Sequence, residues 1–99
     1  MTIEFLPVAK AELDDAVEYY ELELPGLGKK FKEEVRSSLK RIAVFPKAWS
    51  LIRPEIRKCI LHKFPYNILY TIEKNRILIL AIAHHHRNPE YWIGRTPNR

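Results

Sequence analysis

The chain has 99 residues, of which 46 % are hydrophobic and 29 % charged, and its net charge is +5. This composition excludes a disordered chain, and the length fits a single domain over residues 1–99. The longest apolar run has seven residues, whereas a membrane helix needs about 18 or more, and the lone Cys59 excludes an internal disulfide. We therefore expect a cytoplasmic domain.

The charges are segregated along the chain. Residues 1–34 hold nine acidic and four basic residues and carry −5, whereas residues 35–99 hold thirteen basic and three acidic residues and carry +10. The second part is expected to attract phosphate groups or an acidic protein.

Residues 2–6 alternate and predict a first strand, and Pro7 ends it or opens a helix. Apolar residues at helical spacing, from Leu13 to Tyr20, predict an amphipathic helix that runs to about Leu24. We interpret the acidic residues of its other face as solvated: Glu12, Asp14, Asp15, Glu18 and Glu21.

A second helix is predicted between the turn at residues 25–28 and Pro46. Its apolar stripe comprises Phe31, Val35, Leu39 and Ile42, while lysines and arginines occupy its other positions. Two amphipathic helices joined by so short a turn predict a helical hairpin whose stripes face the same way.

Residues 56–64, 66–72 and 77–83 predict three consecutive strands. A polar loop at residues 73–76 joins the last two, and Asn75 is expected to adopt positive φ there. The run 77–83 is apolar on both faces, which is typical of a central strand.

Together these elements predict an α+β fold: an N-terminal strand, a two-helix hairpin and a three-strand antiparallel meander, with the helices on one face of a small sheet. The first strand is expected to pair beside residues 77–83. The other face would have no covering element, leaving Leu69 and alternate residues of the central strand on an open, base-rimmed concavity. Such a surface favours a protein partner.

The run His84–His86 raises the question of a metal site. Only His84 and His86 share a face, and two imidazoles without a cysteine or acid at ligand spacing are a weak metal site. We therefore predict neither a metal nor a cofactor. Trp92 is interpreted as a lid that packs back on the sheet.

A basic cluster with aromatic neighbours is expected where the central strand ends. Arg87 would lie near Lys58, His62 and Lys63 of the preceding strands, a composition suited to gripping phosphate. Metal-free RNA cleavage needs a base, a cation and an acid, and the candidates are Lys58 or His62, Arg87, and His84 or Tyr91.

The chain resembles the RelE/ParE superfamily of toxins from bacterial type II toxin–antitoxin systems. The resemblance rests on Phe64-Pro65-Tyr66, on the strand that runs into His84, and on the H-x-x-R-x-P-x-Y-W ending at residues 84–92. The order of the elements also agrees, and the two motifs are most similar to the ParE-like, plasmid-stabilisation branch.

The resemblance implies a toxin that a cognate antitoxin neutralises in a hetero-oligomer. It implies either a ParE-like inhibitor of DNA gyrase that acts by binding, or a RelE-like ribosome-dependent mRNA endoribonuclease. A nucleic-acid-binding module or an inactive toxin relic is the third alternative. The expected target- or phosphate-binding residues are Arg57, Lys63, His84, His86 and Arg95. For a ribonuclease only, the expected catalytic residues are Lys58, His62, Arg87 and Tyr91. The expected antitoxin-binding residues are Leu69, Leu78, Leu80 and Ile82.

Overall fold

The computed structural model describes residues 1–88 and 90–95. Pro89, which belongs to the C-terminal motif, lies outside the described residues. In chain order the elements are β1 (Thr2–Phe5), α1 (Pro7–Glu23), α2 (Leu27–Val44), β2 (Leu51–Arg53), β3 (Ile56–Ile60), β4 (Tyr66–Glu73) and β5 (Arg76–His84).

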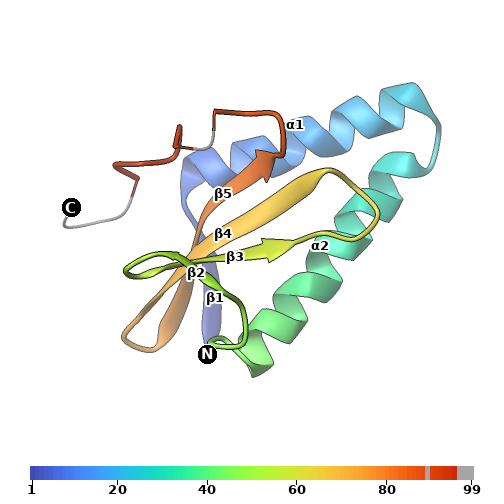
Figure 1. The fold of residues 1–99 in the computed structure, drawn as a ribbon. Helices are drawn as coiled ribbons and strands as arrows, with labels where there is room; N and C mark the ends of the chain where they lie inside the picture. Colours follow the sequence, from blue (N-terminus) through green and yellow to red (C-terminus); the bar gives the residue numbers. More distant parts are fainter. Residues whose placement is uncertain (89, 96–99) are drawn as a thin grey trace.

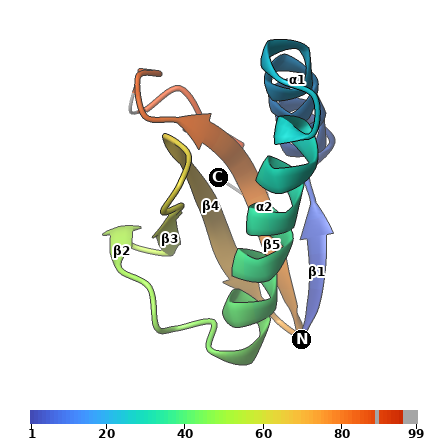
Figure 2. The same ribbon diagram turned by 90° about the vertical axis from the view of Figure 1, so that its right-hand side faces the viewer.

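The strands form one sheet in the order β1-β5-β4-β3-β2 (Figure 1). β1 runs parallel to β5, and the other neighbours are antiparallel. Both helices cover the same face of this sheet (Figure 2). The α+β class, the position of β5 as an interior strand and its pairing with the first strand are therefore confirmed.

The two helices meet at a tight, glycine-dependent turn. Pro7 occupies the first turn of α1, and Gly26 precedes α2 with a φ of 91°, which favours glycine. The Glu21 carboxylate accepts hydrogen bonds from the backbone N–H groups of Gly26 (2.9 Å) and Gly28 (3.1 Å). The first backbone N–H groups of a helix have no acceptor within that helix, and Glu21 of α1 supplies one to those at the start of α2.

The larger core lies between the helices and the sheet. Fully buried residues of α2 such as Phe31 and Ile42 pack against Ile68, Tyr70 and Ile77 of the central strands. Burying side chains of this size contributes about 1.5–3 kcal/mol each, so this layer fixes how the helices lie on the sheet.

The second face of the sheet is covered as well, and the expectation that no element remains to cover it is wrong. Trp92, only 4 % exposed, packs with Ile56, Leu69, Leu78 and Leu80 in a smaller core. The interpretation of Trp92 as a lid is confirmed. Its indole removes from water the apolar side chains that a strand pattern alone would leave open.

A bulge in β5 changes which side chains share a face. Leu69 pairs with Ala81 and Tyr70 pairs with Ile79, so Leu80 is the extra residue in β5. Because of this insertion Ile82 packs in the helix-side core, and the prediction that it shares a face with Leu80 is wrong.

Three local predictions are also wrong. The strand predicted over residues 56–64 ends at Ile60, and a short strand, β2, precedes it. In the loop between β4 and β5 the residue with positive φ is Lys74 (49°) rather than Asn75.

Candidate functional site

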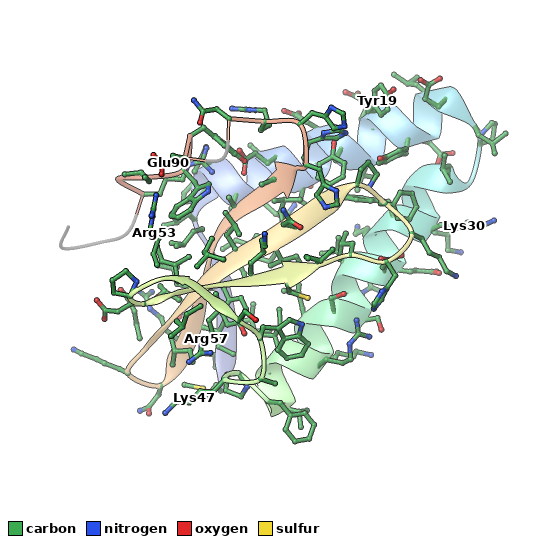
Figure 3. All side chains as sticks on the ribbon, in the orientation of Figure 1. Tyr19, Lys30, Lys47, Arg53, Arg57 and Glu90 are labelled. Atoms are coloured by element: carbon green, nitrogen blue, oxygen red, sulfur yellow. The ribbon has the colours of Figure 1, made fainter. Side chains whose placement is uncertain are left out.

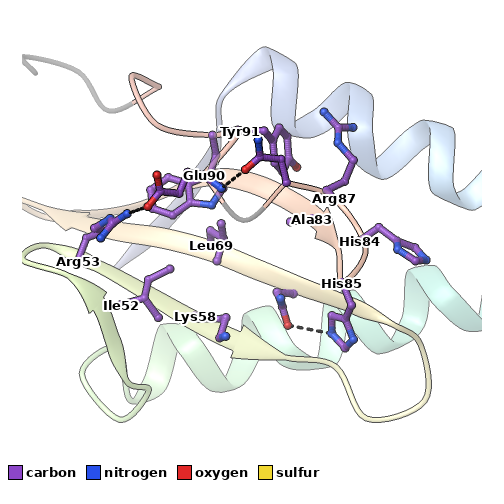
Figure 4. Close-up of a pocket in the computed structure, with 13 residues that line it drawn as sticks. Ile52, Arg53, Lys58, Leu69, Ala83, His84, His85, Arg87, Glu90 and Tyr91 are labelled. Carbon is purple, nitrogen blue, oxygen red and sulfur yellow. Dashed lines mark hydrogen bonds and ion pairs between the residues drawn. The ribbon is translucent and has the colours of Figure 1, made fainter.

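A hollow of about 320 Å³ remains on the second face, beside the Trp92 lid (Figure 4). Its lining comes from β2, β3, β4, the end of β5 and the C-terminal segment that follows. Leu69, Ala83 and Trp92 supply apolar surface, while Lys58, Arg87 and His85 supply polar groups. The hollow thus combines an apolar lining with basic groups.

Two cations line the hollow without an acidic partner among the described residues. Lys58 comes from β3, and Arg87 follows β5, so the sheet brings together residues that are far apart in sequence. The guanidinium carbon of Arg87 lies 3.9 Å from the centre of the Tyr91 ring, a cation–π contact that orients the side chain. A third cation, Arg53, is paired with Glu90.

Glu12 of α1 holds the C-terminal segment against the end of the sheet. Its carboxylate accepts hydrogen bonds from the backbone N–H of Ile82 (3.0 Å), the hydroxyl of Tyr91 (2.9 Å) and the guanidinium of Arg95 (3.0 and 3.1 Å). Arg95 also donates to the Leu80 carbonyl (3.0 Å). Glu12 is therefore the centre of a half-buried polar cluster, and its interpretation as a solvated residue is wrong.

The same cluster stabilises the protonated form of the Tyr91 hydroxyl. Burial, followed by the hydrogen bond to Glu12, raises the pKa of Tyr91 to about 12. Its hydroxyl proton is donated to the Glu12 carboxylate, which lies on the α1 side. Tyr91 is thus a neutral ring that supports Arg87 and Arg95.

The three histidines have different surroundings. His84 is half-buried, and burial together with its neighbours His86 and His85 lowers its pKa, so the neutral ring is favoured near pH 7. Its Nδ1 accepts a hydrogen bond from the His86 backbone N–H (3.0 Å). His85 Nε2 lies 3.0 Å from Asn67 Oδ1 at the edge of the hollow.

The structure brings together only some of the residues proposed from sequence. Lys58, Arg87, Tyr91 and His84 line the hollow. His62 and Lys63 do not, because both backbone N–H groups donate to the Glu34 carboxylate of α2. These two bonds hold their loop on the helix side of the molecule.

Arg57 is also directed away from the hollow. Its Nη1 donates to the carbonyl oxygens of Trp49 (2.6 Å) and Lys47 (3.1 Å), where it holds the segment between α2 and β2 (Figure 3). Arg95 is committed to Glu12, and His86 is exposed beyond the hollow. These three residues therefore do not join Lys58 and Arg87 in one phosphate site.

Polar residues of the site that escaped the sequence-based prediction include Glu12, Arg53, Asn67, His85 and Glu90. Their partners are far away in sequence, as for Glu12 and Arg95, or depend on where the C-terminal segment lies. The only sequence signal was that Glu12 stands one residue before Leu13 of the apolar stripe, at the border of the solvated face.

Within residues 1–88 and 90–95, no group of three or more histidine, cysteine, aspartate or glutamate side chains is placed to hold a metal ion. In the same residues, neither helix combines the length and apolarity required to cross a membrane.

Comparisons with known proteins agree on one group. A family model described as the ParE toxin of the type II toxin–antitoxin system parDE matches residues 3–89. The chain is similar in structure to the chromosomal ParDE TA system from P. aeruginosa, with 19 % identity and a TM-score of 0.75 over 85 % of this chain and 95 % of that chain. It is also similar to the isolated E. coli RelE toxin, with 19 % identity and a TM-score of 0.66 over 91 % and 89 %. No curated protein sequence matches it.

Proposed function

The chain belongs to the family of ParE toxins of type II toxin–antitoxin systems, and we propose that it inhibits DNA gyrase by binding, through the hollow beside Trp92. No bond is made or broken in this action. Membership of the family implies a cognate antitoxin as partner.

The engagement of Tyr91 by Glu12 is the observation that most supports binding over cleavage. Metal-free cleavage of RNA needs a proton donor for the leaving oxygen whose pKa lies near the working pH. The pKa of Tyr91 is raised to about 12 and its proton is already donated to Glu12, while His62 lies outside the hollow. His84 is the remaining candidate acid, and burial with its neighbours His86 and His85 lowers its pKa, so its neutral ring is a poor proton donor near pH 7.

The hollow suits a protein segment. Its apolar lining offers a place for an aliphatic or aromatic anchor. Lys58 and Arg87, which have no acidic partner within residues 1–88 and 90–95, favour acidic residues beside that anchor. A gyrase segment of this composition would be held by burial of its anchor and by charge pairs in a partly dehydrated site.

We propose that the antitoxin neutralises the toxin by covering the same hollow. Leu69, Arg87 and Lys58 would then lie in the toxin–antitoxin interface. Leu78 and Leu80 are buried beside Trp92, and Ile82 lies in the helix-side core. These three residues therefore pack beneath the proposed interface and do not form its exposed surface.

A RelE-like, ribosome-dependent mRNA endoribonuclease is the second candidate. It is favoured by one observation: Lys58, Arg87 and the imidazole of His84 line the same hollow. Such an enzyme would use Lys58 or His84 for proton transfer and Arg87 for the charge of the phosphorane.

Purified toxin incubated with gyrase and supercoiled plasmid tests the proposal. We expect cleaved plasmid to accumulate with the natural chain and not with Arg87→Ala, while Lys74→Ala, a change at the exposed β4–β5 turn, retains the effect. Primer extension after in vitro translation forms the second arm. Codon-positioned cuts that disappear in Arg87→Ala would establish the endoribonuclease instead, and normal growth on induction without the antitoxin would indicate an inactive relic.

A further inference from the structure

The outward face of α2 carries a row of cations that the hollow does not use. Lys29, Lys32, Arg36 and Lys40 are all exposed and recur at spacings of three and four residues, so they form one stripe along the helix. The row spans about 16 Å at a rise of about 1.5 Å per residue.

These charges are not neutralised within the described part of the chain. None of the four cations forms an ion pair there. The exposed acids of α1 are not paired with them, although Glu18 and Glu21 lie with Lys32 around the same shallow depression. Within α2 itself, Glu33 is the exposed acid beside the row, and Lys30, which extends from α2 into solvent in Figure 3, adds a further cation.

The composition of the row favours phosphate over protein. Stable protein interfaces are built around buried apolar or aromatic anchors, and the exposed positions from Lys29 to Lys40 hold only charged residues and Ser37. Duplex DNA carries one negative charge per about 1.7 Å of its axis, so a straight row of flexible cations contacts phosphates without an exact register.

We propose that the outward face of α2 is a second binding surface, one that contacts the phosphate backbone of double-stranded DNA without reading its sequence. This surface is independent of the proposed gyrase site, because α2 and the hollow lie on opposite faces of the sheet (Figures 2 and 4). A toxin whose target acts on DNA, as the proposed gyrase target does, would thereby gain a salt-dependent contact to the nucleic acid.

The salt dependence of binding gives a quantitative test. Each phosphate contact contributes about −0.9 to the slope of log K against log salt concentration for duplex DNA. The variant Lys29→Gln/Arg36→Gln/Lys40→Gln is therefore expected to reduce the magnitude of that slope by about 2.7. Glutamine is a good helix former, and circular dichroism checks that α2 is retained.

The probe is a labelled random-sequence DNA duplex, titrated with the full chain at several salt concentrations and followed by fluorescence anisotropy. The matched control, Lys10→Gln/Lys47→Gln/Lys74→Gln, removes the same charge from exposed sites outside the row and is expected to leave the slope within about one contact of the natural value. Glu33→Gln removes the acid beside the row and is expected to strengthen binding.

Three outcomes would overturn the proposal. Equal losses in the row variant and the control would indicate a net-charge effect alone. A slope that changes only in Lys58→Gln/Arg87→Gln would place the DNA contact in the hollow, and no binding of the natural chain at low salt would remove the surface altogether. Lys58→Gln/Arg87→Gln is also expected to abolish gyrase inhibition, whereas the row variant is expected to retain it. The DNA-binding proposal and the gyrase proposal can therefore be refuted independently.

Discussion

Replacing Glu12 by alanine tests whether one side chain of α1 holds the C-terminal segment in place. The change leaves the Tyr91 hydroxyl, the Arg95 guanidinium and the Ile82 N–H without their acceptor. The side chains of Glu12 and Arg95 are only 16 % and 17 % exposed, so water replaces the carboxylate poorly.

The expected cost follows from this burial. Removing one partner of a buried ion pair costs about 3–5 kcal/mol, and the residual exposure of both side chains reduces our expectation to about 2–4 kcal/mol. For a domain of this size each kcal/mol corresponds to roughly 4–8 °C, so the melting temperature is expected to fall by at least about 8 °C.

Urea unfolding followed by circular dichroism measures the free energy, and the emission of Trp92 in a Trp49→Phe background reports the C-terminal segment. The matched control, Glu18→Ala, removes an exposed acid from the same helix and is expected to change stability by less than about 0.5 kcal/mol. If Glu12→Ala is as stable as Glu18→Ala and the Trp92 emission does not shift, Glu12 does not hold the segment and the reasoning is refuted.

Three further predictions concern packing and pH. Gly28→Ala places a methyl group 2.5 Å from the Val17 carbonyl oxygen, so the helices must separate; we expect a loss of about 1–3 kcal/mol in urea unfolding, and no such loss would contradict the close packing. Trp92→Ala uncovers the second core and is expected to cost about 3–5 kcal/mol, measured the same way, whereas an unchanged midpoint would mean that the lid is dispensable. The pKa of Tyr91 is raised to about 12 in the folded chain, so the unfolded chain loses this proton first. The contribution of protonated Tyr91 to the free energy of unfolding is present below about pH 10 and is lost as the pH rises toward 12. In Tyr91→Phe the free energy of unfolding should therefore decline less steeply at alkaline pH.

The sequence predicted the helices and central strands closely because their signals are local. Pro7 and the turn at residues 25–28 mark helix boundaries, and the apolar run from Ile77 marks β5 as an interior strand of the sheet. Such patterns depend on residues a few positions apart, which is the range over which helical and strand periodicity acts.

The remaining features depend on contacts between distant residues. The bulge at Leu80 reverses the alternation within β5 and turns Ile82 toward the helices, although the run itself is uniformly apolar. Glu34 accepts a hydrogen bond from the backbone of His62, 28 positions away, and Glu12 pairs with Arg95, 83 positions away. No periodicity encodes such pairs, so His62 was placed in the site and Glu12 was left out of it.

The most direct test of the central proposal is the gyrase assay with the natural chain and Arg87→Ala. The proposal predicts that the natural chain causes cleaved plasmid to accumulate, that Arg87→Ala does not, and that messenger RNA stays intact in both. Codon-positioned cleavage of messenger RNA by the natural chain, with no effect on gyrase, would contradict it.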